Sequence, residues 1–431
     1  MVVIYTDKIT PRLRYACGFV FWEQMKLEWM LTEDENCPIS HPSFFINYST
    51  KQIKSAHAFI RPHGLLHQTG IIEQNPNVKK KVDGAALLFP TENDSLGFDL
   101  FSAVFYLLSR YEEYLPYVPD SYGRFPHEKS IAFQNDFLHQ PIVNIWISRL
   151  VDVMQAQVPE LHITKPDFQC RISYDIDMAW SYKYKGLLRN LIGFIKKPEI
   201  KRWRVLLGLE PDPFDTFERM DSTHEKNHTT CIYFFLMARR LSRYDKNIRV
   251  FKKSMQKLIR THAEKYMVGL HPSWRSHRIT RLLAKEKRAL EEISGIKIFT
   301  SRQHYVKWQL PKTFQRLIEN GITEDYSMGY GSINGFRASV ASSFYWYDLE
   351  KEEATPLRLH PFCFMDANCL YEQKLNVEES EKELMYYYDI TRQYGSAFIP
   401  VFHNHFLGSD HDFNGWIALW ERFLQTSKST P

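Results

Sequence analysis

The sequence lacks the features that mark membrane and secreted proteins. Its longest uninterrupted apolar run, residues 231–238, has eight residues, whereas a membrane-spanning helix needs about 20. The N-terminus reads Met-Val-Val-Ile-Tyr-Thr-Asp and has neither the basic start nor the long apolar stretch of a signal peptide. These absences predict a protein without transmembrane segments, and we expect it in the cytoplasm.

Cysteine is scarce, and charge of one sign does not dominate. The six cysteines among 431 residues are scattered, and none lies in a Cys-x-x-Cys pair, which predicts reduced and mostly buried thiols. Lys and Arg number 55 against 50 Asp and Glu, a net charge of +5. Such a balance excludes the densely basic surface of a dedicated nucleic-acid-binding protein, so no nucleic-acid partner is expected.

Apolar residues are abundant, at 44% with 15% aromatic, and they supply enough material for large cores. In residues 1–165, short strand patterns mix with helical ones, such as a helix expected over residues 98–114. This predicts a smaller α/β domain, whose role the sequence does not indicate. In residues 166–431 strands and helices alternate, which favours a TIM-like, distorted (β/α) barrel. We therefore predict an α/β protein of two domains.

Polar side chains follow the predicted barrel strands, at the end where such barrels carry their catalytic groups. The first strand ends at Asp175 and Asp177, and their spacing of two places both carboxylates on one side. The groups after the later strands are His271, His277, Arg302, His304, Asp325 and His403. Two carboxylates with several histidines and an arginine predict a divalent metal beside a water-activating carboxylate and a histidine acid.

The order of these groups resembles the polysaccharide deacetylase family, also called the NodB-homology or carbohydrate esterase family 4 domain. Its Thr-Phe-Asp-Asp-Gly motif is similar to Ser-Tyr-Asp-Ile-Asp at residues 173–177. Its His-Ser/Thr-x-x-His, Arg-x-Pro-x-Gly and Leu-x-His motifs are similar to the segments around His271, Arg302 and His403. The resemblance covers about residues 168–426 and implies a seven-stranded distorted barrel. The N-terminal half resembles an uncharacterised α/β domain that precedes such barrels in bacterial proteins.

The resemblance implies a metal-dependent hydrolase that removes acetyl groups from an N- or O-acetylated saccharide. Asp175 would be the general base for the attacking water, Arg302 would orient that carboxylate, and His403 would protonate the leaving group. Asp177 and His271 would bind the metal. Zn²⁺ is the first expectation for that metal, and Co²⁺, Ni²⁺ and Fe²⁺ are the alternatives.

Two assignments stay open at this point. The family spaces the two histidines of its second motif four residues apart, whereas His271 and His277 are six apart. That is about 240° around a helix, so only an irregular loop would bring them together. His304 is an equally suitable third ligand. Ile176 separates the two aspartates, which leaves open which carboxylate is the base and which is the ligand.

Further residues are predicted to contact substrate or a surface. Arg337 follows a glycine-rich turn and is expected to face an anionic substrate group, with Trp274 and Asp325 as further substrate-binding candidates. Residues 183–204 hold eight basic residues, one acidic residue and several aromatic ones. This pattern fits contact with an acidic glycan, a nucleic acid or the surface of a membrane, although a solvated helix face is the simpler interpretation.

Two other functions fit parts of the pattern. The incomplete second and third motifs fit a catalytically inactive, deacetylase-like protein that binds glycans. The two carboxylates of Asp175 and Asp177 also match the Asp-x-Asp of a nucleotide-sugar transferase, which holds Mn²⁺ and a diphosphate. The transferase hypothesis leaves His271, Arg302 and His403 without a role. The sequence gives no oligomeric state.

Overall fold

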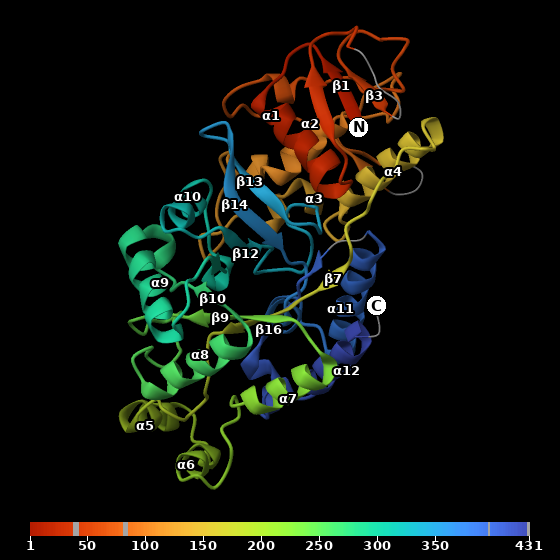
Figure 1. Ribbon diagram of the computed structural model, residues 1–431. Coiled ribbons are helices and arrows are strands. Elements are labelled where there is room, and N and C mark those ends of the chain that lie inside the picture. Colours follow the sequence, from red (N-terminus) through yellow and green to blue (C-terminus); the bar gives the residue numbers. More distant parts are fainter. Residues whose placement is uncertain (38–42, 81–84, 395–396, 429–431) are drawn as a thin grey trace.

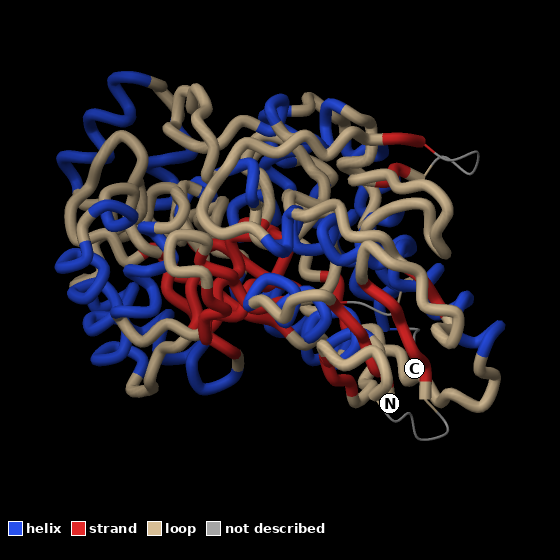
Figure 2. The backbone as a smooth tube through the Cα atoms, turned by 90° about the horizontal axis from the view of Figure 1, so that it is seen from above, coloured by secondary structure: helices blue, strands red, loops and turns tan. Residues whose placement is uncertain are grey.

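The computed structural model describes residues 1–37, 43–80, 85–394 and 397–428 of the chain. It is an α/β protein in which a smaller N-terminal region lies on a larger, barrel-like region (Figure 1). Seen from above, the strands gather in the interior and helices and loops surround them (Figure 2). No helix in the described ranges is both long and apolar enough to cross a bilayer.

A parallel sheet of four strands forms the centre of the N-terminal region, in the order β2-β1-β3-β4. Its strands are β1 (Val2–Thr6), β2 (Trp29–Thr32), β3 (Phe44–Tyr48) and β4 (Ala58–Phe59). Its main helices are α1 (Pro11–Cys17), α2 (Leu100–Leu108), the short α3 (Ile131–Gln134) and α4 (Ile142–Gln157). All nine residues of α2 are buried, so this helix belongs to the core and not to the surface.

The helix expected over residues 98–114 is shorter in the structure. Helix α2 begins after Asp99, whose side chain caps the amide of Ser102, and it ends at Leu108. Arg110 then adopts a left-handed conformation, with φ of 54°, and a single 3₁₀ turn follows over Tyr111–Glu113. The helical spacing of apolar residues therefore continued beyond the point where the backbone leaves the helix.

Seven parallel strands and one antiparallel strand form the sheet of the barrel region, in the order β13-β14-β12-β11-β10-β9-β8-β16. They are β8 (Ile172–Ile176), β9 (Cys231–Leu236), β10 (Met267–His271), β11 (Thr300–Ser301), β12 (Glu324–Met328), β13 (Phe344–Asp348), β14 (Glu353–Pro361) and β16 (Val401–His403). One isolated bridge between Met365 and Val401 joins the two ends of the curled sheet. The sheet is thus a distorted, incompletely closed barrel.

The sequence of the barrel strands fits a sheet that is covered on both faces. All six residues of β9 are buried, and so are all five of β8, as expected for parallel strands flanked by helices. The covering helices are α7 (Phe217–Asn227), α8 (Lys253–Lys265), α9 (Thr280–Ser294), α10 (Lys312–Glu319), α11 (Val377–Gln393) and α12 (Trp416–Lys428). Two short pairs complete the strands: β5 (Lys79–Lys80) with β6 (Ala86–Leu87), and β7 (Gln169–Cys170) with β15 (Ala397–Phe398).

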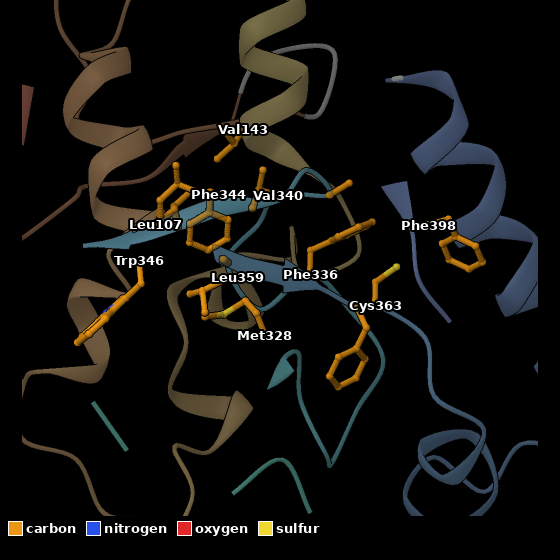
Figure 3. Packing of buried hydrophobic residues seen from close by; sticks show 14 of the residues in the cluster. Leu107, Val143, Met328, Phe336, Val340, Phe344, Trp346, Leu359, Cys363 and Phe398 are labelled. Carbon is orange, nitrogen blue, oxygen red and sulfur yellow. The ribbon is translucent and has the colours of Figure 1, made fainter. Parts of the chain in front are cut away.

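The N-terminal region and the barrel share one hydrophobic core. Leu107 of α2 and Val143 of α4 lie beside Phe344 of β13 and Leu359 of β14 in Figure 3, and one cluster of buried side chains contains all four. The antiparallel hairpin β13–β14 is therefore covered by helices that precede it by about 200 residues in the chain. Residues 158–168 connect the two regions, and we keep 165/166 as the proposed boundary.

Candidate metal centre

A cavity opens at the carboxyl ends of the barrel strands. Its volume is about 340 Å³, a size typical of small-molecule sites. Among its lining residues are Asp175, Asp177, His271, His304 and His403. A larger hollow of about 790 Å³ lies on the N-terminal region, but its lining contains no histidine or cysteine, so we place the candidate site in the barrel.

Asp177, His271 and His304 converge in this cavity. Asp177 follows β8, His271 is the last residue of β10, and His304 follows β11. One ligand atom from each of the three residues lies within 4.8 Å of the others. The Nε2 atom of His271 is 3.1 Å from Oδ1 of Asp177, and that of His304 is 3.4 Å from Oδ2. They meet because parallel strands end at one edge of a sheet.

Each imidazole is held through its other nitrogen. Nδ1 of His271 lies 2.6 Å from the carbonyl oxygen of Arg302, to which it donates a hydrogen bond. Nδ1 of His304 lies 3.3 Å from Oδ1 of Asp245. Acceptors at Nδ1 fix the ring orientation and leave Nε2 for a metal. Both Nε2 atoms face Asp177.

The carboxylate of Asp177 indicates that a cation belongs between these groups. Its Oδ1 is buried and has no hydrogen-bond partner within the described part of the chain, although Nε2 of His271 is only 3.1 Å away. Nδ1 of His271 donates to a carbonyl oxygen, so a neutral ring would present the lone pair of Nε2 to Oδ1 of Asp177, and a cation between the two atoms would bind both. Two imidazole nitrogens and one carboxylate oxygen match the ligand set of catalytic Zn²⁺.

The raised pKa of His304 also indicates a site for positive charge. Burial alone would lower the pKa of this imidazole, but the carboxylates of Asp177 and Asp245 outweigh burial and raise the pKa to about 9. The position therefore stabilises positive charge, which either a protonated ring or a bound cation supplies.

A second carboxylate, Asp175, lies beside the cluster and is held by an arginine. Nη1 of Arg302 donates to Oδ1 of Asp175 over 2.9 Å, and Oδ2 of Asp175 is 3.9 Å from Nε2 of His271. Arg302 is itself fixed, since it also donates to Ser173 Oγ and to the carbonyl oxygen of Tyr326, each over 2.9 Å. One oxygen of Asp175 is thus anchored, while the residue itself lines the cavity.

His403 approaches Asp177 from β16, the neighbour of β8 on the side away from β9. Its Nε2 is 3.7 Å from Oδ2 of Asp177. Its Nδ1 is 2.6 Å from Oδ1 of Asp366, and its backbone amide donates to Oδ2 of Asp366 over 2.7 Å. Burial opposes protonation of this ring, but Asp366 outweighs it and raises the pKa of His403 to about 9. His403 is therefore protonated at neutral pH and can donate a proton.

An aromatic wall completes the cavity, and part of it comes from the N-terminal region. Tyr122 stacks on Tyr305, with ring centroids 5.5 Å apart, and Tyr244 stacks on Trp274 at 3.8 Å. Arg124 donates through Nη1 to the carbonyl oxygens of Tyr305 and of Gly331, over 3.0 and 3.1 Å. Tyr122 and Arg124 both line the cavity.

Three of the sequence-predicted residues lie outside the metal cluster. His277 is buried in a 3₁₀ turn, where its Nδ1 lies 2.7 Å from the carbonyl oxygen of Trp274, and it does not join the group of possible ligands. Asp325 is fully buried and accepts hydrogen bonds from the Ser301 hydroxyl and the Ser327 amide. Neither residue lines the cavity.

Arg337 is also placed elsewhere, and this corrects its expected role. It is 1% exposed and forms two hydrogen bonds with Glu113, of 2.9 and 2.6 Å, while its guanidinium lies 3.7 Å from the centroid of the Trp308 ring. With its charge neutralised by a residue of the N-terminal region, Arg337 joins the two parts of the molecule. Trp274, the remaining substrate-binding candidate, does not line the cavity either, and it stacks on Tyr244, which does.

Sequence reasoning missed Asp245, Asp366, Tyr122 and Arg124. Asp366 carried a usable signal, because it follows shortly after strand β14, as the other polar groups follow their strands. Asp245 lies in a loop between β9 and α8, and Tyr122 and Arg124 lie in the N-terminal region. For those three residues, no spacing in the sequence indicates a connection to the metal cluster.

Comparison with known proteins gives one family match and several structural neighbours. Residues 2–159 match DUF7033, a family of unknown function, and no curated protein matches the sequence. A protein described as a polysaccharide deacetylase from Mycobacterium smegmatis is 13% identical, with a TM-score of 0.41 over 62% of this chain and 87% of that one.

Two further solved structures show a similar level of likeness. A polysaccharide deacetylase from Bacillus cereus is 11% identical, with a TM-score of 0.29 over 60% of this chain and 85% of that chain. A 4-alpha-glucanotransferase from Thermococcus litoralis is 12% identical, with a TM-score of 0.36 over 62% and 38%. Because all three scores are below 0.5, we derive neither fold nor function from these neighbours.

Proposed function

We propose that this protein is a metal-dependent hydrolase that removes acetyl groups from an N- or O-acetylated saccharide. The observation that supports it most is the convergence of Asp177, His271 and His304 on one point beside Asp175. His403 reaches the same point from the last strand. The resemblance to polysaccharide deacetylases assigns Asp175, Asp177, His271 and His403 to the reaction. For the third ligand, left open between His277 and His304, we choose His304.

Asp177, His271 and His304 would hold the metal, for which Zn²⁺ fits the two nitrogens and one oxygen best and Co²⁺, Ni²⁺ and Fe²⁺ are alternatives. When bound, a divalent metal supplies Lewis-acid polarisation of a water molecule and of the acetyl carbonyl. We assign Asp177 as ligand because imidazoles face both of its oxygens.

Asp175 is then the general base. Arg302 engages Oδ1 and keeps the carboxylate in place, so Oδ2 is left to accept the proton of the attacking water. Arg302 acts through Asp175 and is a positioning residue. Its other two hydrogen bonds, to Ser173 and Tyr326, prevent it from swinging into the cavity.

His403 is the general acid. Asp366 holds its ring and keeps it protonated, with a pKa raised to about 9. When the carbon–nitrogen or carbon–oxygen bond breaks, Nε2 of His403 donates its proton to the leaving amine or hydroxyl. The water supplies the hydroxyl group of the acetic acid that departs, and the saccharide retains a free amine or hydroxyl.

The aromatic wall supports a saccharide as the substrate. Tyr122, Tyr244 and Tyr305 line the cavity next to the metal cluster, and aromatic faces pack well against the apolar faces of sugar rings. We propose that the N-terminal region contributes to substrate binding through Tyr122, which gives that region a role in the reaction.

The two alternative functions receive less support from this geometry. A catalytically inactive glycan-binding protein would not need Asp366 to keep His403 charged. In a nucleotide-sugar transferase, the two carboxylates of the Asp-x-Asp motif serve one cation and a diphosphate, whereas here Asp175 is paired with Arg302 and Asp177 with two imidazoles.

The test is acetate release from a panel of N- and O-acetylated saccharides by protein stripped with a chelator and reloaded with Zn²⁺ or Co²⁺. We expect release that depends on the added metal and that His304→Ala abolishes, together with bound metal. His277→Ala is the matched control and should retain metal and activity. Acetate release that persists in His271→Ala and His304→Ala, or stoichiometric metal that yields no acetate from any substrate, would contradict the proposal.

A further inference from the structure

Two short helices between β8 and α7 carry an uncovered apolar surface. Helices α5 (Leu187–Lys196) and α6 (Ile200–Leu206) project from the barrel at the end farthest from the N-terminal region (Figure 1). Residues 184–209 contain nine of the 24 large apolar side chains that are exposed in the described residues. These nine, which we call the apolar hairpin surface, are Tyr184, Leu187, Leu188, Leu191, Ile192, Ile195, Ile200, Leu207 and Leu209.

The degree of exposure shows that the rest of this chain does not cover the surface. Leu187 is 77% exposed, Ile200 is 74% exposed, and Leu188 and Ile195 are each 72% exposed. Single exposed apolar residues are common on proteins, but nine within one segment of 26 residues, five of them on α5, point to a contact with something else. In α5 only Asn190 is buried, so most of this helix contributes nothing to the core.

The charge around the apolar hairpin surface selects the kind of partner. Residues 183–204 contain eight basic residues and one acidic residue, Glu199. Three of the eight form ion pairs, Lys183 with Asp215, Lys197 with Glu199 and Arg204 with Glu210. Two others bind backbone carbonyl oxygens and not carboxylates: Arg189 binds those of Lys246 and Asn247, and Lys201 that of Ser409. Their positive charge is therefore not neutralised by these contacts.

Apolar residues flanked by excess positive charge match a helix that lies in the interface of an anionic membrane. Aromatic residues, here Tyr184 and Trp203, are also typical of protein segments at the level of the lipid headgroups. A second copy of the chain is a poorer partner, because a symmetric contact would bring the two basic segments together.

Hydrogen bonds connect α5 and α6 to segments that reach the metal cavity. Lys246, whose carbonyl oxygen accepts a hydrogen bond from Arg189 of α5, lines that cavity. Ser409, whose carbonyl oxygen accepts a hydrogen bond from Lys201 of α6, follows His403 and His405, which also line it. Docking through α5 and α6 would therefore act on segments that belong to the cavity or lie next to it in the chain.

We propose that the apolar hairpin surface docks on the headgroup region of an anionic phospholipid bilayer. The docking rests on α5 and α6 alone and does not depend on the proposed hydrolase activity. If the protein is a deacetylase, the docking favours a substrate that is anchored in the same bilayer.

The experiment measures co-sedimentation of the full chain with vesicles of phosphatidylcholine alone or with phosphatidylglycerol at a molar ratio of 3:1. We expect binding only to the anionic vesicles, and a decrease in binding when salt is raised from about 0.1 to 0.5 M. The triple variant L187S/L188S/I195S should lower the bound fraction at least tenfold. Because these side chains are 72–77% exposed, it should keep the wild-type circular dichroism and melting temperature.

The matched control removes exposed apolar side chains elsewhere, in V118S/I72S/F299S, whose native side chains are 78, 54 and 53% exposed. It should bind vesicles as the wild type does. The proposal is overturned if the wild-type protein does not bind anionic vesicles, or if L187S/L188S/I195S binds them as tightly as the wild type. A concentration-dependent dimer in analytical ultracentrifugation that L187S/L188S/I195S dissociates, without vesicle binding, also overturns it and assigns the surface to a second copy.

Discussion

At the scale of single residues, the candidate site depends on the acceptors behind its histidines. His271 is held by a backbone carbonyl, His304 by Asp245, and His403 by Asp366. Such partners set the tautomer and the ring orientation of a histidine before a ligand arrives. Asp245 holds the ring of His304, a candidate ligand, whereas Asp366 holds the ring of His403, the proposed acid. Substitution of one or the other should therefore separate metal binding from proton donation.

Replacement of Asp245 by asparagine should weaken metal binding. Asn keeps the size of the side chain but removes the charge that orients His304 and raises its basicity. We expect the dissociation constant for Zn²⁺ to rise by roughly 10- to 100-fold, measured by competition with a chromogenic chelator. An unchanged affinity in Asp245→Asn would show that His304 is not a ligand.

Replacement of Asp366 by asparagine should lower the turnover number and leave metal binding unchanged. Metal content should equal that of the wild type, because Asp366 contacts only His403 among the groups around Asp177. The turnover number for acetate release should fall by roughly 10²- to 10⁴-fold, the contribution of a general acid. The two aspartate variants are each other's controls, and the loss of metal in Asp366→Asn would contradict the assigned roles.

The candidate ligands at strand ends could be proposed from the sequence because a strand and the polar residue after it are adjacent in the chain. Asp177, His271 and His304 all carry this local signal. The expected role of Arg337 was wrong because its partner, Glu113, is 224 residues away in the chain. The sequence around an arginine that follows a glycine-rich turn does not indicate whether it binds a substrate or a buried carboxylate. The choice between His277 and His304 needed the backbone path after β10, which residue spacing does not give.

At the scale of elements, α9 supports the loop that follows β10. Glu286 of α9 is fully buried and accepts hydrogen bonds from the amide of Ser273 and the hydroxyl of Ser276. Burial raises the pKa of Glu286 from 4.5 to about 7. The folded protein thus holds this proton more strongly than the unfolded chain does.

The pKa of Glu286 predicts a pH-dependent stability. Its contribution is fully present below pH 4.5 and is lost as the pH rises through about 7, because the folded state must then bury a charge. Glu286→Gln should remove this loss and gain roughly 2.5 kcal/mol relative to wild type between pH 5 and pH 8. Urea unfolding at both pH values measures it, with Glu292→Gln, on the exposed side of α9, as the control that should show no such difference.

The loop after residue 115 brings the N-terminal region to the substrate cavity through Tyr122. Tyr122→Ala should raise KM by roughly 3- to 10-fold, the range of one aromatic contact, with little change in kcat. Tyr122→Phe keeps the ring and should restore the wild-type KM. Steady-state kinetics on a soluble acetylated saccharide would measure both constants. A fall in kcat without a rise in KM in Tyr122→Ala would contradict a role of Tyr122 in substrate binding.

Most parallel strands and their helices were predictable from apolar runs, but the hairpin β13–β14 was not. Its two strands pair antiparallel after a glycine-rich turn, and along β14 exposed and buried residues alternate. This pattern identifies a strand but not its place at the edge of the barrel sheet. That place depends on α2 and α4, which cover the hairpin from the other half of the chain.

At the scale of the whole molecule, the shared core makes the two regions one folding unit. Phe344 and Leu359 pack against Leu107 and Val143, and the Arg337–Glu113 ion pair is buried beside them. We expect one thermal transition in differential scanning calorimetry, with equal calorimetric and van't Hoff enthalpies. Two resolved transitions would show that the regions unfold separately.

The covered hairpin β13–β14 has a practical consequence for anyone who wishes to isolate or recombine the barrel region. A fragment that starts near residue 160 would present Phe344 and Leu359 to water, and it would also lack Tyr122 in the wall of its cavity. A chimaera with an unrelated N-terminal domain would have the same exposed side chains and the same incomplete cavity. We therefore expect the barrel region to need the first 159 residues as a permanent cover.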